Sequence, residues 1–328
     1  MSPKRLPIVA LLAFAATGCF SPKPLPGLTR LETAQFRFEE TRYEDVTEIT
    51  EWLLDKKRSS QLTAADEAEA AFLAGESFMI LKQHKPAFKY YKRLLETAPW
   101  SPHVQVLEAR LYDIGLALLY DEQYDGWIFD DRGRGVEVMT LLQVHFHQSD
   151  RADDALRHVA DYFASPSQEE WLEASLTYEQ LYTEYPQSEW AERALWLAAN
   201  NRLKRVHDAG YNNGDLIKAH ELLQLSRRVH PRGSSAADVR ADLLHSREML
   251  AGAELVVASF YASRGKPYGE QLRLANAALM YPETEAGKAA RERLVSAGLD
   301  LDAMASDPNL SSTDSRVSRK SPWAQDDA

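Results

Sequence analysis

Three histidines, His145, His147 and His158, come closest in type and spacing to a metal-binding cluster. Imidazole nitrogens are common ligands of zinc and related ions. On a helix, however, residues two positions apart point about 200° away from each other, so His145 and His147 could not share one ion. Their positions also match the end of a helical repeat, which is described below. We therefore interpret these histidines as part of a structural junction and predict no metal site.

Residues 121–126 begin like a calcium-binding loop, with two aspartates and a glycine. Such a loop needs Asp or Asn at its third position and a bidentate Glu at its twelfth. Gln123 and Arg132 stand there instead, so we interpret the segment as an ordinary loop. The Gly-Arg-Gly at 133–135 is too short to cradle a phosphate and follows no predicted strand. Because no Gly-x-Ser-x-Gly motif occurs either, we predict no catalytic residues, no cofactor and no small-molecule substrate.

Cys19 is the single cysteine of the chain, and it follows a segment typical of exported proteins. Lys4 and Arg5 give this segment a positive start, and residues 6–18 are apolar and uncharged. A helix needs about 20 apolar residues to span a bilayer, so residues 6–18 are too short to span one. The pattern indicates a signal peptide over residues 1–18.

The small residues Ala16, Thr17 and Gly18 directly before Cys19 resemble the lipobox of bacterial lipoproteins. The resemblance implies cleavage before Cys19 and a lipid on its thiol, although lipoboxes prefer Leu at the position of Ala16. The alternative is a secreted protein with a free thiol. Two or more acyl chains anchor a protein stably, so we expect membrane contact through the lipid alone. Three prolines within residues 22–26 then predict an extended tether over residues 19–30.

The net charge of −11 argues against nucleic acid as a partner, and no dense cluster of Lys and Arg offers a phosphate-binding face. Hydrophobic residues make up 45% of the chain and charged residues 27%, as in an ordinary folded protein. No segment shows sustained alternation of apolar and polar residues, so we predict no sheet. The elements that position any functional surface must therefore be helices.

A repeat of helix pairs organises these elements. In a 34-residue frame that starts at Ala68, small, aromatic, small, aromatic and proline residues fall at places 8, 11, 20, 24 and 32. They are Gly75, Phe78, Ala87, Tyr91 and Pro99. Small side chains let two antiparallel helices approach, aromatic side chains fill the space between pairs, and proline ends the second helix. This is the tetratricopeptide pattern.

The same spacing recurs along the chain, before Pro186, Pro231 and Pro282. The matching residues are Ala109, Tyr112, Ala174, Tyr178, Leu181, Ala219, Leu223, Ala258, Tyr261, Leu274 and Ala277. We predict an all-α, tetratricopeptide-like helical repeat solenoid of about five helix pairs, with junctions near residues 99, 147, 186, 231 and 282. Irregular stretches are expected at residues 121–135 and 208–215.

A second pattern also recurs: a Ser or Thr stands two positions after three of the helix-ending prolines. Ser101, Ser188 and Thr284 can each cap the next helix by accepting a hydrogen bond from a free backbone N–H. Pro102 then suits the first helical position, where no donor is needed. Residues 146–155 also copy residues 185–194 at an offset of 39, with a histidine in place of the proline.

Repeats of this kind behind a lipobox resemble the BamD-like family of outer-membrane assembly lipoproteins. The segment 185–194, Tyr-Pro-Gln-Ser-Glu-Trp-Ala-Glu-Arg-Ala, is similar to a repeat junction of that family, and residues 257–284 are similar to its last repeat. The resemblance covers roughly residues 64–295. It implies a periplasmic scaffold that is lipid-anchored in the outer membrane and works with the barrel-assembly protein and its lipoprotein subunits. No contact motif matches residue by residue.

We expect a repeat domain over residues 31–300 and a disordered tail over 301–328, which is rich in Ser and Asp. A stack of repeats curves and offers a concave surface for partner proteins. Tetratricopeptide geometry predicts that this surface includes Glu69, Phe72, Glu76, Met79, His103, Val106, Arg110 and Asp113. Trp127 belongs to an apolar cluster, residues 124 and 127–129, which either packs under the repeats or meets a partner. Two other hypotheses remain open, a scaffold lipoprotein of cell-wall or pilus machinery and an enzyme.

Overall fold

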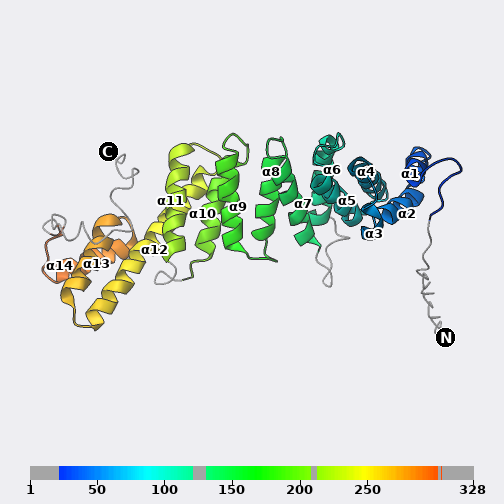
Figure 1. Ribbon diagram of the computed structural model, residues 1–328. Helices are drawn as coiled ribbons and strands as arrows, with labels where there is room; N and C mark the ends of the chain where they lie inside the picture. The colour runs from blue at the N-terminus through cyan, green and yellow to red at the C-terminus, as the bar shows by residue number, and fades with distance from the viewer. Residues whose placement is uncertain (1–21, 121–130, 208–212, 302–303, 305–328) are drawn as a thin grey trace, which may run out of the picture. The chain divides into compact units, whose positions relative to one another are not determined.

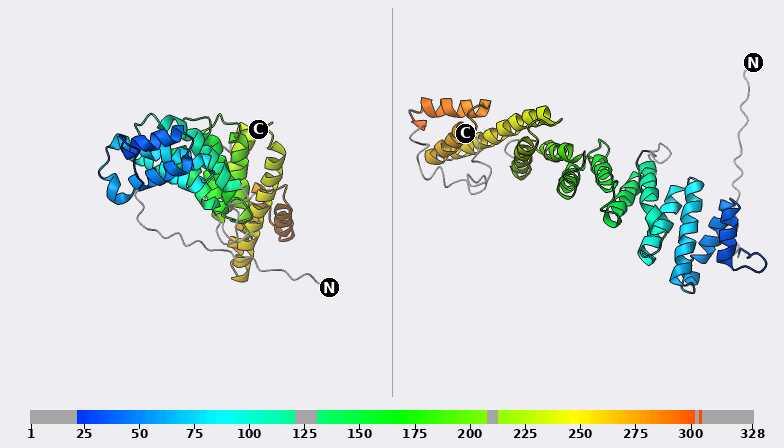
Figure 2. Two further views of the ribbon diagram at one scale, coloured as in Figure 1. Left: turned by 90° about the vertical axis from the view of Figure 1, so that its right-hand side faces the viewer. Right: turned by 90° about the horizontal axis from the view of Figure 1, so that it is seen from above.

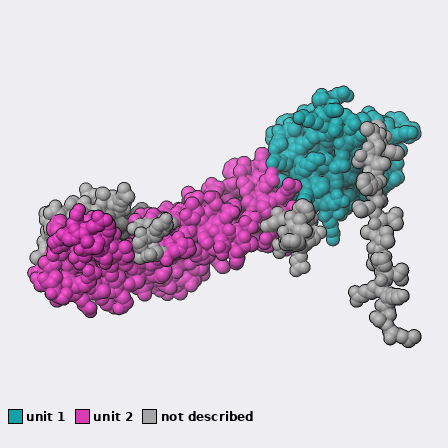
Figure 3. All heavy atoms as spheres, turned by 90° about the horizontal axis from the view of Figure 1, so that it is seen from below, with its two compact units in different colours: residues 1–114 teal, residues 115–328 magenta. Residues whose placement is uncertain are grey.

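The computed structural model describes residues 22–120, 131–207, 213–301 and residue 304, and every regular element within these ranges is an α-helix (Figure 1). The chain divides into two compact units, residues 1–114 and 115–328, which are coloured separately in Figure 3. The boundary falls inside one helix, α6 (Val104–Tyr120), between Ile114 and Gly115. The predicted signal peptide, Cys19, Trp127 and nearly all of the predicted tail lie outside the described residues.

The helices of the first unit are α1 (Arg30–Glu39), α2 (Tyr43–Leu53), α3 (Lys56–Ser59), α4 (Ala64–Ile80), α5 (His84–Thr97) and the first part of α6 (Val104–Tyr120). Those of the second are the rest of α6, α7 (Arg132–His145), α8 (Ala152–Phe163), α9 (Trp171–Glu184), α10 (Ala191–Lys204), α11 (Asn213–Val229), α12 (Ala236–Ser263), α13 (Pro267–Met280) and α14 (Glu285–Ser296).

The five predicted helix pairs are confirmed, as α4 with α5, α6 with α7, α8 with α9, α10 with α11, and α12 with α13. The second helices end at residues 97, 145, 184, 229 and 280, each next to a predicted junction. Within the second unit each helix from α8 to α13 packs on the one that follows, and Figure 2 shows α8 to α11 side by side. The fold is therefore an all-helical repeat of the tetratricopeptide type.

The small and aromatic positions of the repeat pack as predicted. Tyr91 is fully buried, and a Cβ atom added to Gly75 would overlap its ring. The matching Ala87, Ala174 and Ala219 are also fully buried. Because no side chain larger than hydrogen fits at position 75, the glycine allows α4 and α5 to approach closely, in spite of the roughly 1 kcal/mol that glycine costs inside a helix.

Two expected loop boundaries are wrong. The stretches 121–135 and 208–215 were expected to be irregular throughout, yet α7 already begins at Arg132 and α11 at Asn213. Glycine at positions 133, 135 and 214 favours a loop by propensity. In α7 packing overrides this preference, because a Cβ at Gly135 would collide with Leu119 of α6. Residues 121–130 and 208–212 lie outside the described part of the chain.

The described part of the predicted tether also departs from an extended path. Pro22 is buried, and its carbonyl accepts a hydrogen bond from Arg30 Nε at 3.1 Å. A turn at Gly27, which has a φ of +83°, brings the Leu28 amide to the Leu25 carbonyl. The chain from residue 22 onward is therefore held against α1.

The hydroxyl caps are confirmed at one junction and shifted at two. Thr284 caps α14, because its side chain accepts from the Gly287 amide at 2.9 Å. Ser188 accepts from the Trp190 amide at 3.1 Å, one turn before α10 begins. Ser101 is related in the same way to the His103 amide, at 3.4 Å. Pro102 consequently lies in this turn and not at the first position of α6.

Acidic side chains link the start of one repeat to the next. Asp153 in α8 accepts from the Ser188 hydroxyl at 2.5 Å. Glu192 in α10 accepts from the Ser235 amide at 2.8 Å, and Glu248 in α12 accepts from the amides that follow Thr284. Glu192 and Glu248 satisfy backbone amides that the start of a helix would otherwise leave free, whereas Asp153 binds a side-chain hydroxyl. Successive repeats are therefore joined by charge as well as by apolar packing.

The apolar packing of the second unit includes two clusters of buried residues. The first joins α8 to α12, and the second joins α12, α13 and α14 around Ala258, Leu274 and Leu294. The 28-residue helix α12 contributes to both. None of the helices in the described ranges has the length and apolarity needed to cross a bilayer.

Candidate partner-binding surfaces

The predicted binding residues of the first unit lie on α4 and on the segment that leads into and forms α6. His103 Nε2 donates to Glu69 Oε2 at 2.7 Å, and the His103 ring stacks on Phe72 with 4.0 Å between centroids. Gln35 of α1 donates to the other oxygen of Glu69 at 3.1 Å. Glu69, Phe72 and His103 therefore lie together, but the polar groups of Glu69 and His103 are already hydrogen-bonded to each other.

Glu76 and Arg110 form a second internal pair. Arg110 donates to both oxygens of Glu76, at 2.9 and 2.8 Å, and the Tyr91 hydroxyl donates to Glu76 Oε1 at 2.6 Å. The hydrogen bond to Glu76 raises the pKa of Arg110, while burial and the Glu76 carboxylate raise the pKa of Tyr91. Glu76 is buried, so these two charged residues connect helices and are not freely offered to a partner.

The other predicted residues are more accessible. Val106 is 45% exposed, Asp113 is exposed and Met79 is half-buried. Sequence reasoning missed Trp100, which is 63% exposed in the turn between α5 and α6 and is the most exposed large hydrophobic side chain of the described residues. The sequence could have identified Trp100 as a candidate, because a tryptophan directly after Pro99 has no role in the repeat pattern. The function of this surface remains a prediction.

The three histidines do not act together. His158 is buried in α8, and its Nδ1 lies 2.6 Å from the Tyr120 hydroxyl. His145 and His147 are exposed at the end of α7 and in the junction that follows. Among the described residues, no group of three His, Cys, Asp or Glu side chains is arranged to hold a metal ion.

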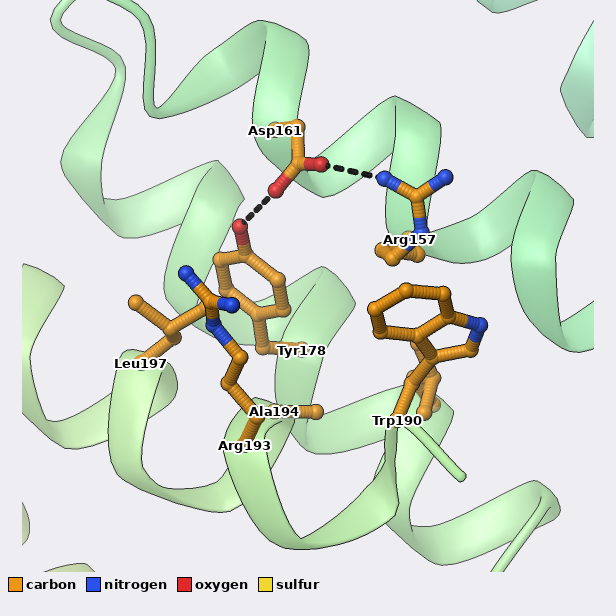
Figure 4. A pocket seen from close by; sticks show the side chains of 8 residues that line it. Arg157, Asp161, Tyr178, Trp190, Arg193, Ala194 and Leu197 are labelled. Atoms are coloured by element: carbon orange, nitrogen blue, oxygen red, sulfur yellow. Dashed lines mark hydrogen bonds and ion pairs between the residues drawn. The ribbon is translucent and has the colours of Figure 1, made fainter. Parts of the chain in front are cut away.

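A pocket in the second unit was not predicted. It has a volume of about 290 Å³ and lies between α8, α9 and the start of α10 (Figure 4). Its lining residues are Arg157, Asp161, Tyr178, Leu181, Trp190, Arg193, Ala194 and Leu197. The floor is apolar and aromatic, and charged groups stand around it.

Most polar groups of this pocket are fixed. Arg157 donates to Asp154 at 2.7 Å and to Asp161 at 2.8 Å, and its guanidinium lies 4.4 Å above the Trp190 ring. Burial disfavours the charged guanidinium, but the hydrogen bond to Asp154 and the charges of both aspartates outweigh burial and raise the pKa of Arg157. The Tyr178 hydroxyl donates to Asp161, and burial together with that carboxylate raises the pKa of Tyr178.

Arg193 is the exception among these groups. Its side chain is exposed, and Figure 4 shows it on the opposite side of Tyr178 from Trp190. Its guanidinium makes no hydrogen bond or ion pair with any residue that the structure describes, although it is near enough to Tyr178 to influence the pKa of that hydroxyl. The pocket thus combines an apolar floor with one cation available to a ligand.

Comparison with known proteins agrees with this architecture. A family model, YfiO, described as an outer membrane lipoprotein, matches residues 119–309, which is more than half of the chain. The match includes both segments on which the sequence resemblance rests, and it begins later than the residue 64 expected from sequence. No curated protein matches the chain. The chain belongs to the BamD-like YfiO family of outer membrane lipoproteins.

Proposed function

We propose that this protein is a lipid-anchored, periplasm-facing scaffold of the machinery that assembles β-barrel proteins into the outer membrane. It binds the barrel-assembly protein and its lipoprotein subunits through the surfaces of its helical repeats, and it binds without catalysing a reaction. Cys19 carries the lipid, after removal of residues 1–18. The observation that carries this proposal is the family match, which spans the repeats of the second unit.

The character of the repeats supports a binding role. Each helix pair buries one face against its neighbours and leaves the other face to solvent, which suits extended contact with proteins. In the first unit, the internal pairs of Glu69 with His103 and Glu76 with Arg110 hold α4 and the α6 segment in fixed register. The accessible Val106 and Asp113 are thereby presented on a rigid surface, which lowers the entropic cost of binding.

Co-purification tests the partner directly. The tagged full chain is extracted from envelopes in mild detergent, and its partners are identified by mass spectrometry. The barrel-assembly protein is the expected main partner. Recovery of cell-wall or pilus components in its place would support the competing hypothesis and overturn this proposal.

Anchoring is tested separately. Cys19→Ala removes the thiol that would carry the lipid, so the protein should move from the outer-membrane fraction to the soluble periplasmic fraction. Cys19→Ser should behave in the same way, because a hydroxyl does not replace the thiol. Unchanged membrane fractionation of both variants would contradict lipid attachment at this residue.

A further inference from the structure

The repeat fold does not require the chemistry of the pocket between α8, α9 and α10. Residues 146–155 and 185–194 are equivalent junctions, offset by 39 positions. Ala191 and Ala194 are buried, and their counterparts Ala152 and Ala155 are buried as well, so alanine is what packing demands there. The counterparts of Trp190 and Arg193 are Arg151 and Asp154. The aromatic ring and the cation therefore belong to this one junction.

The size and lining of the pocket suit a single bulky side chain. A buried apolar cavity of about 150 Å³ is large enough to bind benzene, and this pocket has about 290 Å³. Leu181 and Leu197 offer aliphatic contacts, and the rings of Tyr178 and Trp190 offer aromatic ones. An aromatic side chain of a partner would gain both apolar burial and ring contact.

One cationic group at the pocket is available to an anion. The charge of Arg157 is balanced by Asp154 and Asp161, which hold its guanidinium in place. Asp161 also accepts from the Tyr178 hydroxyl, so both carboxylates are engaged. Arg193 makes no hydrogen bond or ion pair with a carboxylate among the described residues, so its guanidinium is the one that a ligand can use. A guanidinium presents its N–H groups as a planar fork that matches the two oxygens of a carboxylate. Arg193 can therefore hold one carboxylate of a partner, on a chain whose net charge is −11.

We propose that this pocket binds an extended segment of a partner protein that carries an aromatic side chain close to an Asp or Glu. The aromatic ring enters between Trp190, Tyr178 and Leu197, and the carboxylate pairs with Arg193. This inference rests on the proposed function, since it assumes that the repeats bind proteins, and it adds the kind of segment that one particular site recognises.

Short peptides test the proposal. Fluorescent hexapeptides with both ends blocked carry one Phe followed by one Asp in a Gly-Ser background, and their binding to the detergent-solubilised full chain is measured by anisotropy. Replacing Phe by Ala, or Asp by Asn, should each weaken binding by about tenfold or more. A peptide with Phe, no acidic residue and a free carboxyl end is the competing ligand. If it binds as well as the acidic peptide, the site recognises chain ends and the proposal is wrong.

Variants of the protein assign the effect to the pocket. Arg193→Gln should weaken binding of the Phe-Asp peptide by about tenfold. It should leave binding of the Asn-containing peptide unchanged, because that peptide has no carboxylate to pair with Arg193. Arg240→Gln removes another exposed arginine, from α12, and should leave binding unchanged. Leu197→Trp fills the pocket and should abolish binding while helicity by circular dichroism is retained.

Other results would overturn the proposal. They are the absence of binding by the Phe-Asp peptide, equal binding by wild type and Arg193→Gln, or equal losses in Arg193→Gln and Arg240→Gln. These results are separable from failure of the proposed function. A chain that still captures the barrel-assembly protein but ignores the peptide keeps its role as a scaffold and loses only this site.

Discussion

The buried carboxylates Asp215 and Glu76 each accept hydrogen bonds from two side chains. Asp215 accepts from Arg202 at 3.0 Å and from Arg205 at 2.7 Å, and Glu76 accepts from Arg110 and Tyr91. Leaving one member of such a set without its partner costs several times what the pair contributes. At the scale of the residue, stability therefore depends on small numbers of side chains whose neighbours are specified.

Gly75 offers a test of close packing. Gly75→Ala places a Cβ against the Tyr91 ring, so we expect a loss of roughly 1–3 kcal/mol in the free energy of unfolding from overpacking. Gly214→Ala in α11 is the matched control, because a Cβ there meets nothing within 4 Å. It should be neutral or stabilising by up to about 1 kcal/mol. Denaturant unfolding of both variants decides, and equal effects would contradict the packing argument.

His220 predicts a dependence of stability on pH. Burial, with the charges of Arg247 and Arg227, lowers the pKa of His220 from 6.5 to about 4, against an opposing effect of Glu283. The unfolded chain therefore takes up a proton near pH 6.5 that the folded chain refuses until about pH 4. Stability contributed by neutral His220 is present above pH 6.5 and is lost as the pH falls through this window, by up to about 3 kcal/mol.

The measurement compares unfolding midpoints at about pH 7.5 and about pH 5. His220→Gln can still hydrogen-bond to the Ser246 hydroxyl, which lies 2.9 Å from His220 Nδ1, but cannot titrate. Its loss of stability on acidification should be smaller than that of the wild type. If the two losses are the same, other groups account for the acid sensitivity.

At the scale of the element, α14 shows how side chains cap the start of a helix. Thr284 accepts from the Gly287 amide and donates to the Tyr281 carbonyl, and Glu248 holds the Glu285 and Ala286 amides. Four donors without intrahelical partners occur at every helix start, so the two side chains together satisfy most of this requirement for α14. The cap also fixes the direction in which α14 leaves the junction after α13.

Removing the cap tests this role. Thr284→Ala should destabilise the α12–α14 region by about 1 kcal/mol, because the Gly287 amide loses its acceptor. Thr284→Ser keeps the hydroxyl and should retain most of the stability. Amide hydrogen exchange in α14 measures the difference, and equal protection in the two variants would show that Glu248 alone suffices.

At the scale of the whole molecule, each described repeat packs mainly against the repeats next to it along the chain. The core around Ala258, Leu274 and Leu294 is separate from the core that joins α8 to α12, although α12 contributes to both. In such arrays stability is approximately a sum over repeats and their interfaces. Damage to one end is therefore expected to open that end before the rest.

Leu294→Ala tests this expectation. Leu294 is fully buried in α14, so its truncation should cost about 2–5 kcal/mol locally. Hydrogen exchange should accelerate in α13 and α14, while α4 and α5 keep the protection of the wild type. Uniform acceleration in all helices would mean that the chain unfolds as a single cooperative body.

The sequence by itself determined the repeat and its punctuation. Small residues such as Ala87 and Ala174, aromatic residues such as Tyr91 and helix-ending prolines such as Pro186 lie at fixed separations along the chain, and these separations set which face of a helix packs. The five pairs and their junctions followed from this local information. The start of α7 did not, because Gly133 and Gly135 favour a loop, and only the packing of Leu119 against Gly135 overrides this preference.

The tertiary structure alone decided which side chains meet across helices. Glu76 and Arg110 were predicted for a partner, yet the fold brings these residues, which are 34 positions apart, together as an internal pair. The pocket of Trp190 and Arg193 likewise needs α8 and α9 beside α10. Spacing along a chain fixes the face of the helix on which a residue lies. The residues that contact this face belong to other helices, and only the packing of the helices determines which residues these are.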